Sequence, residues 1–113
     1  MNTILVLFKK NGKRKDIPII DNDTIIGRQP DCNIRVLKSS VSRHHCKVSM
    51  NENKVTICDL ESSNGTFVNS KKIEIPTTVH PGDILTVADI HFTVSIDGKP
   101  QEITPPEYAM GIE

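Results

Sequence analysis

Residues 46–59, CKVSMNENKVTICD, carry the pattern that decides the fold. Apolar and polar residues alternate along 46–50 and again along 54–59, and this period of two is typical of strands with one buried face. Between the two runs stands Asn51-Glu52-Asn53, a polar triplet of the kind that turns a chain. The stretch therefore predicts two neighbouring strands joined by a tight turn.

The same short period continues on both sides of this stretch. Further strands are predicted at 4–8, 16–20, 24–26, 33–36, 66–68, 84–87 and 90–96, with turn signals such as Asn11-Gly12 and Pro81-Gly82 between them. Because Pro18 cannot donate a hydrogen bond to a ladder, 16–20 is expected at a sheet edge or to be irregular. No long stretch has a helical period, so about ten or eleven short strands predict a β-sandwich or barrel.

Length and composition narrow the classes of function. The chain has 113 residues, which fits one domain, and we expect it at 1–97 with a short proline-containing tail at 98–113. Lys and Arg total 14 against 14 for Asp and Glu, which argues against a nucleic-acid partner because duplex binders need a basic surface. There is no apolar run of about 20 residues to insert in a membrane. Three cysteines without metal spacing favour a reduced, cytoplasmic setting.

Residues 42–46, SRHHC, allow three kinds of chemistry. A nucleophile with its base is disfavoured, because Ser42 and His45 would point to opposite faces of an extended segment and no third group orients the histidine. A metal site is disfavoured too, because only His44 and Cys46 would share a face, and zinc needs three or four ligands. We therefore expect no enzyme activity, no metal and no cofactor. The third kind, anion binding, gains support from two other segments.

Those two segments are rich in hydrogen-bond donors. Arg28 follows Gly27 at the end of a predicted strand, and a guanidinium can hold a phosphate through two parallel hydrogen bonds. Residues 62–66, SSNGT, form a predicted tight turn with hydroxyl, amide and backbone donors. Loops at one end of a sandwich commonly carry a binding site, so these segments predict a site for an anion.

Taken together, the three segments resemble the forkhead-associated (FHA) domain family. Gly27-Arg28, then 42–45 (SRHH), then 59–69 (DLESSNGTFVN) follow the family pattern Gly-Arg, Ser-Arg-x-His and Ser-x-Asn-Gly-Thr-x-x-Asn in order, spacing and identity. The resemblance covers roughly residues 3–97. It implies an all-β fold, an eleven-stranded, antiparallel-type β-sandwich of the SMAD/FHA kind, that binds phosphothreonine peptides through loops at one end.

The resemblance also implies a role for each matching position. Arg28 would be the main phosphate ligand and Ser42 would donate its hydroxyl, with Arg43 adding charge beside it. Ser63 would reach the phosphate through its hydroxyl or N–H, and Asn64 would hold the peptide backbone. His45 would brace the loops by hydrogen bonding. The remaining positions would shape the site without touching the ligand, namely Gly27, Gly65, Thr66 and Asn69.

Two positions depart from the family pattern. Glu61 stands where many members have glycine, and Ser70 where glycine often follows the asparagine. Neither departure removes a phosphate ligand. The expected function is therefore a monomeric, non-catalytic module in Ser/Thr-kinase signalling that binds a phosphothreonine-containing protein. The alternative is a structural FHA-like domain that assembles with partners independently of phosphate.

Overall fold

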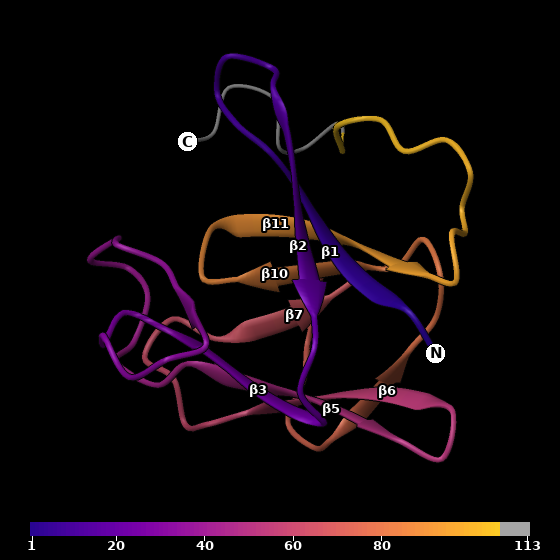
Figure 1. Ribbon diagram of the computed structural model, residues 1–113. Helices are drawn as coiled ribbons and strands as arrows, with labels where there is room; N and C mark the ends of the chain where they lie inside the picture. The colour runs from indigo at the N-terminus through magenta and orange to yellow at the C-terminus, as the bar shows by residue number, and fades with distance from the viewer. Residues whose placement is uncertain (107–113) are drawn as a thin grey trace.

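The computed structural model describes residues 1–106, and this part of the chain folds into eleven strands without a helix (Figure 1). In chain order the strands are β1 (Thr3–Phe8), β2 (Arg14–Ile19), β3 (Asp23–Gly27), β4 (Ile34–Arg35), β5 (Cys46–Asn51), β6 (Lys54–Asp59), β7 (Thr66–Val68), β8 (Lys71–Lys72), β9 (Thr77–Val79), β10 (Ile84–Val87) and β11 (Ile90–Ile96). No segment of these residues is a helix long and apolar enough to cross a membrane.

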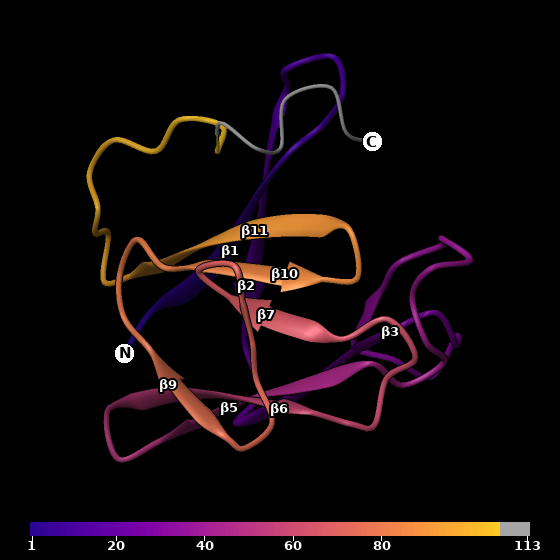
Figure 2. The same cartoon turned by 180° about the vertical axis from the view of Figure 1, so that it is seen from behind.

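The strands form two sheets packed face to face, which confirms the predicted all-β sandwich. One sheet has six strands in the order β2-β1-β11-β10-β7-β8, and the other has five in the order β4-β3-β5-β6-β9. Figure 2 shows β9 beside β6 at the outer edge of the five-stranded sheet. All described strand pairs are antiparallel except β3 and β4, which run parallel.

The β5–β6 hairpin follows directly from the alternation in its sequence. Val48 lies opposite Ile57 and both side chains are fully buried, whereas Lys47 and Thr56 on the other face are partly exposed. The turn between the strands contains two consecutive residues in the left-handed region, a conformation that tight hairpin turns require. The alternation of apolar and polar residues and the geometry of the turn therefore favour the same pairing register of β5 and β6.

The core lies between the two sheets and takes side chains from both. Its largest fully buried members are Phe92, Leu5, Ile26, Ile57 and Leu85. Thr3 and Thr93 are buried as well, and within residues 1–106 their hydroxyl groups have no hydrogen-bond partner. Most of the inner surface is thus aliphatic, while Thr93 lies on the opposite face of β11 from the core residues Phe92 and Val94.

The first and last strands are neighbours in the six-stranded sheet. Thr3 of β1 lies opposite Ile96 of β11. Just beyond this pair, the Asn2 N–H donates to the Asp97 carboxylate at 2.8 Å, and the Asp97 N–H donates to the Asn2 carbonyl at 2.7 Å. These hydrogen bonds therefore hold the start of β1 next to the end of β11, on the side opposite the loops that follow β3 and β4 (Figure 1).

Strand boundaries differ from the prediction at several places. The edge position expected for the Pro18 strand is confirmed, but β2 begins at Arg14 because its hairpin partner β1 pairs as far as Phe8. The short strands β8 and β9 had no alternating signal. Each is held by pairing with a neighbour, β8 with β7 and β9 with β6. Residues 98–106 follow the last strand, and the rest of the predicted tail, 107–113, lies outside the described residues.

Candidate functional site

Three loops meet at one end of the sandwich and carry most of the predicted site residues (Figure 1). The first follows β3, the second joins β4 to β5, and the third joins β6 to β7. Backbone hydrogen bonds tie the first two together, because the Arg28 N–H lies 3.0 Å from the carbonyl oxygens of both Ser42 and Arg43. The loops therefore form one surface built from segments far apart in the sequence.

Arg28 lies at the start of this surface with a partly buried side chain. Its Nε donates to the Val41 carbonyl at 3.0 Å, which fixes the direction of the guanidinium. Among residues 1–106 this is the one hydrogen bond of the Arg28 side chain, so its two Nη groups keep their donors for a ligand. A guanidinium held by Nε and open at Nη is prepared for a planar, two-pronged contact with an oxyanion.

Gly27 is needed here because another backbone segment passes very close to it. A Cβ at this position would collide with the carbonyl group of Arg43 and would lie 2.8 Å from the Cys32 Sγ. Its φ is ordinary, so steric room is the reason for glycine and conformational freedom is not. The close approach allows the hydrogen bonds that place Arg28 beside Ser42.

Ser42 and Asn64 connect the second loop with the third. The Ser63 N–H donates to the Ser42 Oγ at 3.0 Å, and the Asn64 Nδ2 donates to the Ser40 carbonyl at 2.7 Å. Since the Ser42 oxygen accepts from Ser63, its own proton is available to a ligand. Arg28, Ser42, Ser63 and Asn64 are thus brought to one surface, and Arg43 lies beside Ser42 with its side chain exposed.

His45 is completely buried beneath these loops and joins them. Its Nδ1 accepts a hydrogen bond from the Ser42 N–H at 3.0 Å, and its Nε2 lies 2.8 Å from the Gly65 carbonyl. One nitrogen must accept and the other must donate, so these partners select the tautomer protonated at Nε2. Because Nδ1 is occupied by a backbone N–H, His45 is not placed to take a proton from the Ser42 hydroxyl.

Asp59, at the end of β6, organises the third loop from within. Its Oδ1 accepts from the Ser62 and Thr66 hydroxyls, each at 2.6 Å, and its Oδ2 accepts from the Ser62 N–H at 3.2 Å. Desolvation raises the pKa of Asp59, but the hydrogen bonds from Ser62 and Thr66 lower it more, and the pKa lies below its ordinary value. The carboxylate form is therefore part of the loop structure.

The other predicted shaping residues occupy two different places. Gly65 has φ +88 and its carbonyl accepts from His45, while Thr66 is fully buried against Asp59. Asn69 lies at the other end of β7. Its amide donates to Asp83 at 3.1 Å and accepts from the Ile84 N–H at 2.9 Å. Asn69 therefore fixes the β7–β8 turn to β10.

His44 belongs to a cluster separate from the three-loop surface. His44 Nε2 lies 3.0 Å from an Asp31 carboxylate oxygen, and the Cys32 Sγ lies close enough that all three ligand atoms fall within 4.8 Å of one another. The shared strand face that we expected for His44 and Cys46 does not form, because β5 begins only at Cys46. Burial raises the pKa of Cys46 to about 12, as befits a core thiol.

Comparison with known proteins identifies the family. The sequence model of the FHA domain matches residues 24–88, which is more than half of the chain. The chain belongs to the FHA domain family. The three site loops lie within the matched residues, so the family match covers the whole site.

Two relatives and one further structure are similar to this FHA domain. Mouse proliferation marker protein Ki-67 is 31% identical over 103 residues, and the chain spans only 3% of its length. Mycobacterium tuberculosis EmbR, solved with a low-affinity phosphopeptide, is 32% identical with TM-score 0.76 over 84% of this chain and 24% of that one. A structure from a study of phosphothreonine-dependent FHA domain interactions is 25% identical with TM-score 0.74 over 85% of this chain and 97% of that one.

Sequence reasoning missed two groups that position the site of this FHA domain. Asp59 was taken only as part of the family block, although a carboxylate three residues before a serine is a common way to close a turn. Asp89, in the β10–β11 turn, accepts from the Ser40 hydroxyl at 2.8 Å and pairs with Lys38 at 3.2 Å. No local signal could reveal this contact, which spans 49 residues.

Proposed function

We propose that this FHA domain is a non-catalytic module that binds phosphothreonine-containing proteins in Ser/Thr-kinase signalling. One observation carries the proposal. The open guanidinium of Arg28, the available hydroxyl of Ser42 and the side chain of Asn64 come from three loops that hydrogen bonds join into one surface. This surface offers several donors to an oxyanion and supplies no base to a nucleophile.

Each residue takes a distinct part in the proposed complex. Arg28 holds the phosphate through Nη, and the Ser42 hydroxyl donates to another phosphate oxygen. Ser63 adds its hydroxyl as a donor, since its N–H already donates to the Ser42 Oγ. Asn64 holds the peptide backbone, and Arg43 contributes positive charge. A phosphate carries a charge of about −1.5 to −2 and three acceptor oxygens, so it uses more of these donors than one carboxylate does. Aspartate and glutamate are therefore poor substitutes for the modified residue.

The preference for phosphothreonine over phosphoserine rests on its methyl group. Burying one methyl group stabilises a complex by about 0.8 kcal/mol, which corresponds to an affinity difference of about four-fold. We place the module in the cytoplasm, as a monomer whose binding part is residues 1–97. Its three cysteines are free thiols, which agrees with a reduced compartment.

The deciding experiment is titration with an oriented phosphothreonine peptide library, with phosphoserine and unphosphorylated versions in parallel. Wild type should select phosphothreonine. Arg28→Ala should weaken this binding by about ten- to a hundred-fold, the effect of losing about 1.5–3 kcal/mol of charged hydrogen bonding. Arg14→Ala is the matched control, because Arg14 is exposed on β2 and pairs only with Asp16 among the described residues.

Two results would contradict the proposal. Equal binding of phosphorylated and unphosphorylated peptides would remove its basis. Full partner affinity in Arg28→Ala would favour the alternative, a domain that assembles with partners independently of phosphate. Thermal unfolding of both variants is the check that a loss of binding does not come from a loss of folded protein.

A further inference from the structure

A groove opens between the outer strands of the two sheets. It has a volume of about 680 Å³ and is lined by β1, the β1–β2 turn, β2, β4, the start of the β4–β5 loop and β11. β2 is the edge of the six-stranded sheet and β4 the edge of the five-stranded sheet. Edge strands carry backbone N–H and C=O groups without a partner strand, so the strands beside the groove offer pairing positions to an extended chain.

The floor of the groove is apolar. Leu7, Ile17, Ile34 and Val36 lie there, half-buried against the core. Leu37 stands beside them with 72% of its surface exposed, which is unusual for a leucine in a groove otherwise in contact with the core. An extended peptide with aliphatic side chains would cover this surface and pair with an edge strand.

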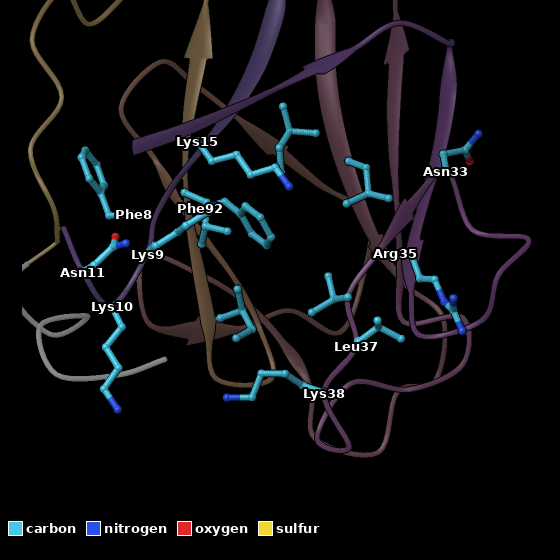
Figure 3. Close-up of a pocket in the computed structure, with 15 residues that line it drawn as sticks. Phe8, Lys9, Lys10, Asn11, Lys15, Asn33, Arg35, Leu37, Lys38 and Phe92 are labelled. Atoms are coloured by element: carbon cyan, nitrogen blue, oxygen red, sulfur yellow. The ribbon is translucent and has the colours of Figure 1, made fainter. Parts of the chain in front are cut away.

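The rim of the groove is basic. Figure 3 shows Lys9 and Lys10 of the β1–β2 turn on one side, and Arg35 and Leu37 on the other. Lys15 and Lys38 complete five cations, of which Lys38 already pairs with Asp89 at 3.2 Å, and no carboxylate occurs among the described residues that line the groove. Lys9 and Lys15 make no ion pair within residues 1–106. In a chain with net charge +0, this concentration of positive charge selects an acidic occupant.

The groove lies next to the proposed phosphate site. The Arg35 Nε donates to the Arg28 carbonyl at 2.9 Å, and Lys38 belongs to the same loop as Ser42. One partner chain can therefore occupy both surfaces at once. When two contacts are linked in this way, the second forms at a high effective concentration and raises the affinity of the first.

From these features we infer that the groove binds an acidic, aliphatic segment of the same protein that supplies the phosphothreonine. The inference rests on the proposed function and adds to it the chemistry of the partner. The segment binds in an extended form, its Leu, Ile or Val side chains on the apolar floor and its Asp or Glu side chains toward the lysine rim. A nucleic acid fits less well, because the aliphatic side chains Leu7, Ile17, Ile34, Val36 and Leu37 line the groove beside only two aromatic rings, Phe8 and Phe92, and Phe92 is buried in the core.

The test compares two peptide libraries. The short library has a fixed phosphothreonine with randomised neighbours, and the long library adds a randomised segment to either side of it. Wild type should enrich Asp, Glu and aliphatic residues in the added segment. The selected long peptides should bind at least about ten-fold more tightly than their own short cores, a gain equivalent to about 1.4 kcal/mol. High salt should reduce the gain, because rim charges are screened.

Variants of residues that line the groove test whether the groove is the source of the gain in affinity. Leu37→Glu and Lys15→Glu should each remove most of the gain and leave the affinity for short phosphopeptides unchanged. Ile75→Glu is the control for Leu37→Glu, because Ile75 is 73% exposed and lies away from the groove, between β8 and β9. Lys54→Glu is the control for Lys15→Glu, since Lys54 is an exposed lysine of β6. Both controls should keep the gain.

Four outcomes overturn the inference. Selection of phosphothreonine without acidic or aliphatic enrichment would do so and leave the proposed function standing. Enrichment without any phosphothreonine preference would overturn the proposed function, and with it the link between the two surfaces. Self-association that Leu37→Glu abolishes would assign the groove to a second copy. Amide shift changes at Ile34 and Leu37 on removal of residues 107–113 would assign it to the chain's own tail.

Discussion

The buried imidazole of His45 accepts a hydrogen bond from the Ser42 N–H at 3.0 Å. Through its other nitrogen it holds the Gly65 carbonyl at 2.8 Å. A residue that touches no ligand in the proposed complex thus connects two of the three loops that would bind it. Its removal should affect both stability and binding.

His45→Ala should lower the free energy of unfolding by about 2–4 kcal/mol, because a cavity forms and two buried backbone groups lose their partner. Urea denaturation measures this loss. Phosphopeptide affinity should fall as well, since Ser42 would no longer be held. His44→Ala is the neighbouring control, because His44 is exposed and pairs with Asp31 at the surface. An unchanged unfolding midpoint in His45→Ala would contradict the bracing role.

Asp59→Asn should destabilise the protein at neutral pH. It should also make the free energy of unfolding less dependent on pH in the acidic range. The pKa of Asp59 is lowered in the folded state, so the carboxylate stabilises the fold above the unfolded pKa of about 3.9. This stabilisation is lost as the pH falls through the lower folded pKa. The asparagine keeps one acceptor but turns an N–H₂ group toward Ser62.

Urea denaturation of wild type and Asp59→Asn between neutral and acidic pH measures this difference. The two stabilities should converge at low pH. If they stay equally far apart at every pH, the ionised carboxylate is not the source of the stabilisation.

Glu61→Gly and Ser70→Gly should each stabilise the protein. These two departures from the family pattern both have positive φ, 57° for Glu61 and 71° for Ser70. A left-handed conformation costs an ordinary residue about 1–2 kcal/mol, and glycine avoids this cost while losing about 0.5–1 kcal/mol of chain entropy. A net gain of up to about 1.5 kcal/mol is expected in chemical denaturation. Glu52→Gly, also at positive φ but in the β5–β6 turn, should behave alike.

Thr93→Val and Thr3→Val should stabilise the fold by about 1 kcal/mol each, because each replaces a buried hydroxyl that has no partner among the described residues with a methyl group of similar size. Thr66→Val is the opposite control. The Thr66 hydroxyl is buried and donates to Asp59 at 2.6 Å, so its loss should destabilise. Thermal unfolding of the three variants distinguishes paired from unpaired hydroxyls, and the same sign in all three would contradict the assignment.

The Asp31–Cys32–His44 cluster should contain no stoichiometric zinc in protein purified without added metal. Burial raises the pKa of Cys32, which keeps the thiol protonated near neutral pH, while zinc binds the thiolate. Asp31 and His44 already satisfy each other. Elemental analysis of the purified protein tests this, and one zinc per chain that is lost in Cys32→Ser would show a metal site.

The alternating stretches and the family blocks account for most of what could be predicted. Val48 and Ile57 lie where the period of two puts them, and the turn at 51–53 joins their strands as expected. The strands β8 and β9 had no such pattern, because two or three residues hold their place only by pairing with β7 and β6. Short pairing of this kind is decided by tertiary structure.

The candidate site was predictable as a set of residues and not as a set of contacts. The matching blocks named Arg28, Ser42 and Asn64 without indicating that Val41 and Ser40 carbonyls would hold two of them. The groove had no motif at all, because its lining comes from several segments, β1, β2, β4, β11 and the loops beside them, and its basic character appears only when those segments are adjacent. The roles of the site residues remain predictions, to be tested by the titrations above.

The pairing of β1 with β11, closed by Asn2 and Asp97, has a consequence for gene architecture. Entry and exit of the chain are side by side, at the end of the sandwich away from the site loops (Figure 1). A domain connected in this way can be inserted at many positions in a longer polypeptide without steric conflict at its binding end. Such a domain can therefore occur in unrelated longer proteins with its binding surface unchanged.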